Sequence, residues 1–159
     1  MTPFDVAAGI ALLLVRPGMI VMVTPFFGAL NAPMHVRAGL TILLAVLMGL
    51  AAPVPPTLPA TGLAVVVLRE MAIGLAIAMA VRVVVGAAEL AGHFIGYQIG
   101  LSLGALIDPQ SGVRNNVLAV LYANIVVILC LATNAHHDVL RALADSYTAL
   151  PIGFGGIDG

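Results

Sequence analysis

The chain has 159 residues, of which 62% are hydrophobic and only 8% are charged, and its formal net charge is −1. Soluble domains are roughly 45–50% apolar and about 25% charged, so this composition predicts a membrane protein. The near-zero net charge and the absence of a basic patch argue against a nucleic-acid-binding protein.

The first predicted helix covers residues 4–30, which is long enough to span a bilayer. Arg16 and Pro17 stand at its centre. Proline removes a backbone donor, so a kink is expected there, and an arginine at mid-depth is expected to face protein or water rather than lipid. A second helix is predicted near 34–52. A rigid, extended connector with four prolines follows over 53–62.

The third predicted helical stretch begins near Leu63 and runs, with interruptions, towards Ile107. Its glycines recur at every fourth residue towards the end of this stretch: Gly92, Gly96, Gly100 and Gly104. On a helix, this spacing makes a stripe without side chains that lets another backbone pack closely. Alternatively, the glycines let the backbone leave helical geometry before Asp108 and Pro109. Both interpretations place 92–109 against protein rather than lipid.

Ionisable residues also gather in this stretch. Arg82, Glu89 and His93 are spaced by seven and four residues, so they share one helical face. They could form a proton or ion path through the membrane. We favour the interpretation that they join Arg16 and Glu70 as buried polar contacts between helices, because a proton path normally needs acceptors on several helices.

The last predicted elements are a turn at 108–112, an apolar spanning helix over 115–135 and an amphipathic helix over 137–149. One side of the amphipathic helix carries Val139, Leu140, Leu143 and Tyr147. The predicted fold class is therefore all-α. We expect a polytopic membrane protein with about four apolar helical segments and an amphipathic C-terminal helix, forming one domain over 1–159.

The sequence predicts neither an enzyme nor a cofactor or metal site. His136, His137 and Asp138 are adjacent, and successive side chains on a helix diverge by about 100°, so they do not converge as zinc ligands must. The serines and the single cysteine lie in no complete nucleophile motif. An intramembrane enzyme using His93, His136 or Asp108 is the weakest functional hypothesis.

Several stretches, in their order along the chain, resemble the FliR family of the flagellar export gate, whose virulence counterparts are the SctT components of type III secretion injectisomes. The first are Arg16, then TPFFGALNAP (24–33) and Arg37. They are followed by REMAIGLAIA (69–78), AGHFIGYQIGLSLGALIDP (91–109), NAHH (134–137) and LPIG (150–153). The stretch at 91–109 is the strongest match.

The resemblance implies a non-enzymatic subunit in the bacterial inner membrane, at a flagellar basal body or injectisome base. Its implied partners are FliP-, FliQ-, FlhB- and FlhA-like proteins and unfolded export substrates. In the family, the stretch around the Gln-x-Gly-Leu-Ser…Asp-Pro motif supplies an apolar plug that helps to close the pore. Carried over to this chain, with Ile107 added as an apolar candidate, that segment includes Gln98, Gly100, Leu101, Ser102, Leu103, Leu106, Ile107, Asp108 and Pro109.

The chain departs from the family pattern in three ways. Leu103 and Leu106 stand where members often have aromatic residues, and Ala135 replaces a glycine. The chain also stops soon after LPIG, so we expect it to correspond to the family's N-terminal portion, without the FliQ-like part. The other function kept open is a small secondary transporter or ion channel that uses Arg82, Glu89 and His93 as its polar path.

Overall fold

The computed structural model describes residues 3–27, 33–51, 62–100 and 117–152. Within these ranges the regular elements are helices and no strand is present. They are α1 (Pro3–Val23), α2 (Met34–Ala51), α3 (Leu63–Gln98), α5 (Val117–Ala132) and α6 (Ala135–Ala149). The all-α prediction is confirmed.

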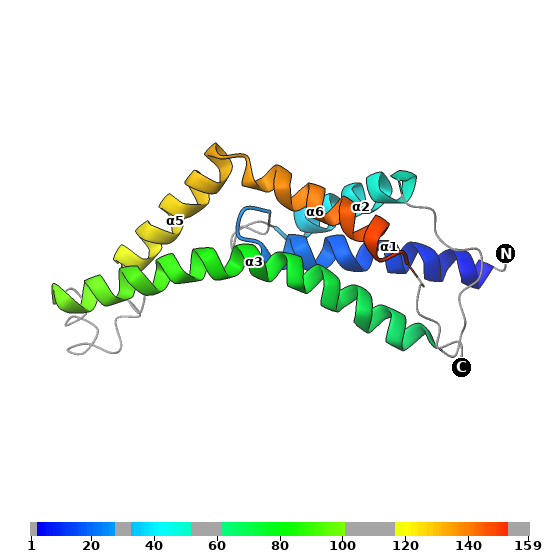
Figure 1. Ribbon diagram of the computed structural model, residues 1–159, viewed down its shortest axis with the longest axis horizontal. Helices are drawn as coiled ribbons and strands as arrows, with labels where there is room; N and C mark the ends of the chain where they lie inside the picture. The colour runs from blue at the N-terminus through cyan, green and yellow to red at the C-terminus, as the bar shows by residue number, and fades with distance from the viewer. Residues whose placement is uncertain (1–2, 28–32, 52–61, 101–116, 153–159) are drawn as a thin grey trace.

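The long helix α3 organises the other helices. It runs along the length of the molecule, with α1 packed beside one part of it and α5 meeting its far end (Figure 1). The helix α2 packs on α1, and α6 turns back from the tip of α5 to contact α3. The result is a bundle around α1, α3 and α6 from which the end of α3 and α5 project.

The helix α1 is shorter than the predicted 4–30, and it continues through Pro17. It ends at Val23 because Pro25 has no N–H and disfavours helical geometry in the residue before it. Thr24 closes the last turn, since both its N–H and its hydroxyl donate to Ile20 O, at 3.0 and 2.6 Å.

The helix α3 shows none of the predicted interruptions between Leu63 and Gln98, and it stops well before Ile107. Its last turn is closed by Ile99 N–H donating to Ile95 O at 3.1 Å and by Gly100 N–H donating to Tyr97 O at 3.2 Å. Gly100 has φ 77°, which glycine adopts without strain. Gly100 therefore ends the helix and is not part of a helical stripe.

The predicted helices at 115–135 and 137–149 are present with shifted bounds. The helical geometry is interrupted by a turn at Thr133 and Asn134, and the axes of α5 and α6 differ by 69°. Asn134 has φ 60°, and asparagine is one of the few residues other than glycine that adopts this left-handed conformation readily.

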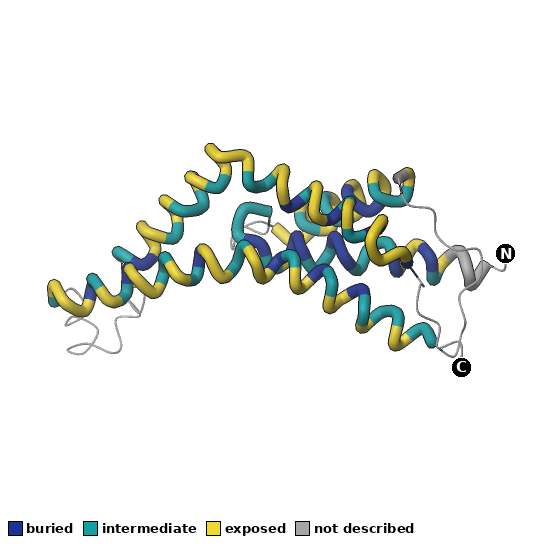
Figure 2. The backbone as a smooth tube through the Cα atoms, in the orientation of Figure 1, coloured by how far each residue is buried: buried dark blue, intermediate teal, exposed yellow. Residues whose placement is uncertain are grey.

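The hydrophobic core lies where α6 packs against α1 and α3. The buried members of this core are Leu12, Ile20, Ala78, Val139, Leu143, Tyr147 and Ile152. Three of them lie on the predicted apolar side of α6, so the amphipathic prediction is confirmed. Figure 2 shows that burial concentrates around this junction, whereas α5 and much of α2 are exposed despite being apolar.

In the described ranges, one helix is long and apolar enough to span a membrane. The 36 residues of α3 include a window with mean hydropathy 2.2, and α5 with α6 could form a second, bent span. The apolar helices at Ala7–Val23 and Met34–Leu50 are shorter. The structure therefore supports one spanning helix, or two with the bent pair, and the prediction of several spans is not confirmed.

Candidate functional site

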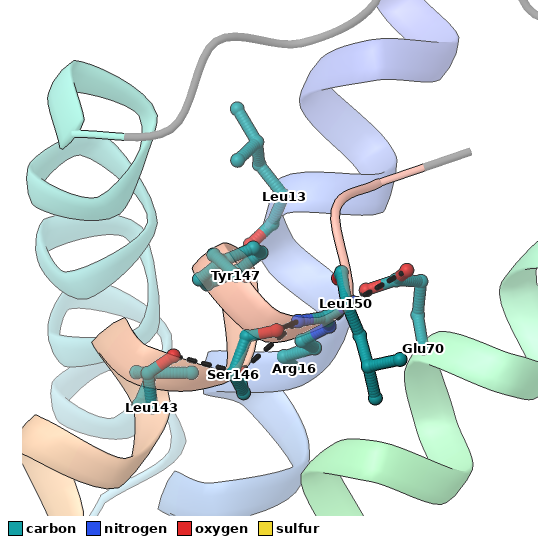
Figure 3. A network of polar contacts seen from close by, with 7 residues as sticks. All are labelled: Leu13, Arg16, Glu70, Leu143, Ser146, Tyr147 and Leu150. Atoms are coloured by element: carbon teal, nitrogen blue, oxygen red, sulfur yellow. Dashed lines mark hydrogen bonds and ion pairs between the residues drawn. The ribbon is translucent and has the colours of Figure 1, made fainter. Parts of the chain in front are cut away.

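Arg16 and Glu70 form a fully buried ion pair between α1 and α3 (Figure 3). Arg16 Nε donates to Glu70 Oε2, and Nη2 donates to Oε1 at 3.0 Å. Both side chains have 0% exposure. A bidentate arginine–carboxylate contact is among the strongest hydrogen-bonded pairs, and pairing of this kind is what lets two charges stay buried.

Arg16 also holds the end of α6. Its Nη1 donates to Ser146 O at 2.8 Å and to Ser146 Oγ at 3.0 Å, and Nη2 donates to Leu150 O at 2.6 Å. With the two contacts to Glu70, these five bonds match the five N–H groups of a guanidinium. Ser146 O also accepts from Leu150 N–H at 3.0 Å, and the carbonyls at a helix C-terminus attract cations because the negative end of the helix dipole lies there. We call Arg16, Glu70, Ser146 and Leu150 the Arg16 cluster.

Tyr147 connects α6 to α1 beside this cluster. The guanidinium carbon of Arg16 lies 4.4 Å from the centroid of the Tyr147 ring, within the range of a cation–π contact. The Tyr147 hydroxyl donates to Leu13 O at 3.4 Å. Leu13 lies four residues before Pro17, so its carbonyl has lost its helical N–H donor. Pro17 thus leaves Leu13 O without its helical donor, and the Tyr147 hydroxyl of α6 supplies the missing hydrogen bond.

Gly74 lets α3 reach the Arg16 cluster. It is buried one turn after Glu70. A Cβ on Gly74 would lie 2.9 Å from Arg16 O and 3.0 Å from Arg16 Cα. These contacts are too short for any side chain, so the backbones of α1 and α3 meet here because the residue is glycine.

Tyr147→Phe is expected to lower the free energy of unfolding by about 0.5–1.5 kcal/mol, because Leu13 O would lose its only donor from α6. Denaturant unfolding of the purified chain in one detergent measures this effect. Tyr97→Phe, at a tyrosine that is 67% exposed on α3, is the matched control and should leave stability unchanged. Equal effects of the two changes would show that the Tyr147 hydroxyl does not support α1.

The far end of α3 holds α5 through a second close contact. A Cβ on Gly92 would lie 2.5 Å from Ala119 Cα and 2.7 Å from Ala119 N. Gly92 and Gly96 are both buried. The described part of the predicted glycine stripe thus includes one direct backbone contact within this chain, and Gly104 lies outside the described residues.

The predicted plug segment connects the two helices that meet at Gly92. Gln98 is the exposed last residue of α3, and Gly100 follows it in the left-handed conformation. The other predicted plug residues lie outside the described residues: Leu101, Ser102, Leu103, Leu106, Ile107, Asp108 and Pro109.

The structure divides the predicted polar residues into two groups. Arg16 and Glu70 belong to the buried cluster. Arg82 Nη2 lies 3.5 Å from Glu89 Oε2, and these side chains are 43% and 34% exposed. His93 is half-buried one turn beyond Glu89. Both partners of the second ion pair come from α3 itself, so this pair does not join two helices of the described chain.

The corner between α5 and α6 carries His136 and His137, whose ring centroids are 4.2 Å apart. Asp138 instead pairs with Arg141 on the exposed side of α6 at 3.2 Å. Across the described ranges, no three His, Cys, Asp or Glu side chains are arranged to hold a metal ion.

From the sequence, Arg16 and Glu70 were expected as buried polar contacts, and Tyr147 was expected on the apolar side of its helix. The contacts that Gly74, Ser146 and Leu150 make with Arg16 were not predicted. The spacing of Glu70 and Gly74 was a usable signal, because residues four apart share a helical face. Ser146 and Leu150 carried no comparable signal, since their contacts with Arg16 join positions more than a hundred residues apart.

One family model matches nearly the whole chain. The family is described as bacterial export proteins, family 1, and its model matches residues 7–158. A search of curated proteins finds no match.

Proposed function

The chain belongs to the FliR/SctT family of bacterial export proteins, and on that premise we propose that it is a non-enzymatic subunit of the type III protein-export gate. It is a bacterial export-apparatus protein, acting in protein transport and secretion. The gate role is the specific part of the proposal.

The observation that supports the gate role is the close packing of the two helices that flank the plug segment along the chain. α3 ends at Gln98 and α5 begins at Val117, and the two helices touch backbone to backbone at Gly92 and Ala119. In our proposal, this closely packed helix pair flanks the plug residues along the chain. The stretch 101–107 is mostly apolar, and rigid flanking helices suit a constriction that must close again in the same place after a chain has passed.

The chemistry of that segment fits a gate that blocks ions. A constriction lined by apolar side chains can lose its water when it closes, and a dry pore stops ions. In our proposal, Leu103, Leu106 and Ile107 form this constriction. The residues that flank it in the sequence complete the proposed plug: Gln98, Gly100, Leu101, Ser102, Asp108 and Pro109.

We further propose an inner-membrane location in a flagellar basal body or injectisome base, as a multi-pass subunit beside FliP-, FliQ-, FlhB- and FlhA-like proteins. Two features support contact with other apolar partners. Leu50 on α2 is 83% exposed and Ile128 on α5 is 63% exposed, and such apolar faces suit contact with lipid or with the apolar helices of partner subunits. The passing cargo would be unfolded export substrates.

Replacing both Leu103 and Leu106 with alanine is expected to raise the ion conductance of the closed, assembled gate, because the constriction becomes wider and easier to wet. Planar-bilayer recording of the purified gate measures the conductance. Leu43→Ala with Leu47→Ala, two leucines exposed on α2, removes the same side-chain volume elsewhere. Equal conductance of the plug variant and this control would contradict the plug assignment.

A further inference from the structure

A groove of about 530 Å³ opens between α1 and α2, and no residue of the Arg16 cluster lines it among the described residues. Leu14, Gly18 and Met22 of α1 line one wall, and Arg37, Ala38 and Ile42 of α2 line the other. Its volume lies within the range of about 300–1,000 Å³ typical of small-molecule sites.

The chemistry of this groove is that of a lipid site. Its walls are mostly alkyl and thioether side chains, and among the described residues Arg37 is the one charged residue that lines it. Met22 is 62% exposed and Ile42 is 55% exposed, so the groove opens onto an apolar surface. A guanidinium has five N–H donors, so Arg37 can hold a contact within the chain and still donate to a phosphate.

The shape of the groove favours an acyl chain over a protein helix. α1 and α2 are in direct contact, and Gly18 and Ala38, the two smallest residues that line the groove, contribute little side-chain volume to it. A helix with its side chains is about 10–12 Å wide, which is too wide for a hollow between two touching helices.

We propose that the groove binds one acyl chain of an anionic membrane lipid, with the lipid phosphate at Arg37. The proposal requires a membrane location but not the gate role, so it can fail or succeed independently of that role. It assigns Arg37 to headgroup selection, and it assigns Gly18 and Ala38 to the space for the chain.

Native mass spectrometry of the full 159-residue chain, extracted in a nonionic detergent, tests the proposal. The probes are phosphatidylglycerol and phosphatidylcholine with identical acyl chains. One basic residue near an anionic headgroup contributes about 1 kcal/mol, or about fivefold in affinity. We expect one phosphatidylglycerol to bind with about that preference. Equal binding of the two lipids would overturn the proposal.

Two substitutions should fill the groove from opposite walls. In Gly18→Leu, the new Cβ would lie 3.5 Å from Thr41 Cγ2, which is an ordinary contact. The rest of the leucine side chain would then occupy the groove. Ala38→Leu fills the groove from α2. Both should abolish binding, whereas Gly39→Leu, at a position with nothing within 4 Å, should bind as the parent does.

Arg37→Gln distinguishes the contribution of the headgroup to binding from that of the acyl chain. It should remove the preference for phosphatidylglycerol and leave weak binding of both lipids, because the apolar walls remain. Retention of the preference in this variant would overturn the role of Arg37. Binding by Gly18→Leu and Ala38→Leu at the level of Gly39→Leu would show that the lipid binds elsewhere on the protein.

Discussion

Arg16→Met is expected to lower the free energy of unfolding by about 3–5 kcal/mol, the largest single effect we predict, because Glu70 would stay buried without its partner. The same change also removes the donors to Ser146 O and Leu150 O, so α6 should detach first. Denaturant unfolding in one detergent gives the free energy, and limited proteolysis within α6 reports the detachment.

The chain offers a matched control for this change. Arg141 also pairs with a carboxylate, Asp138, but the two side chains are 77% and 70% exposed, and exposed pairs contribute about 0–1 kcal/mol. Arg141→Met should therefore change stability little. Adding Glu70→Leu to Arg16→Met should recover part of the loss, because no unpaired buried charge remains. Similar losses for Arg16→Met and Arg141→Met would refute the structural role of the cluster.

Gly92→Ala and Gly86→Ala are expected to change stability in opposite directions, although both replace a glycine inside α3 with a better helix former. At Gly92, the new Cβ would meet Ala119 Cα at 2.5 Å, and overpacking of this kind costs about 1–3 kcal/mol. At Gly86, a new Cβ would have nothing within 4 Å, so the change should stabilise the helix by up to about 1 kcal/mol.

The Gly92 prediction also bears on the gate. If the contact of α3 with α5 holds the plug segment, Gly92→Ala should raise the conductance of the closed gate as well as lower stability, whereas Gly86→Ala should leave conductance unchanged. Unfolding and bilayer recording of the same preparations measure both quantities. A stabilising effect of Gly92→Ala would show that α3 and α5 are not packed backbone to backbone.

Local chemistry predicted the type and order of the helices but not their ends. The apolar run at 4–30 looks continuous, yet Pro25 ends α1 at Val23. The predicted boundary between 135 and 137 lies close to the observed corner at Thr133 and Asn134. The 69° angle between α5 and α6 was not predictable, because it depends on how α6 packs against α1 and α3. Tertiary contacts decide such boundaries, and periodicity alone does not contain them.

The polar residues show the same limit. The cost of burying charge correctly marked Arg16 and Glu70 as residues that need partners. Their pairing joins positions 54 residues apart, which no local pattern encodes. In the row of Arg82, Glu89 and His93, helical spacing predicted a shared face, but it did not predict that Arg82 and Glu89 would pair with each other. The groove at Arg37 depends on how two helices pack, so it was not predictable either.

The most direct test of the gate assignment is co-purification of the tagged 159-residue chain with FliP-like and FliQ-like proteins from the same source. Mild-detergent extraction is followed by measurement of the particle mass and the subunit content. Our account predicts a defined particle that contains this chain together with the FliP-like protein. A particle of FliP-like and FliQ-like proteins that assembles without this chain would contradict it.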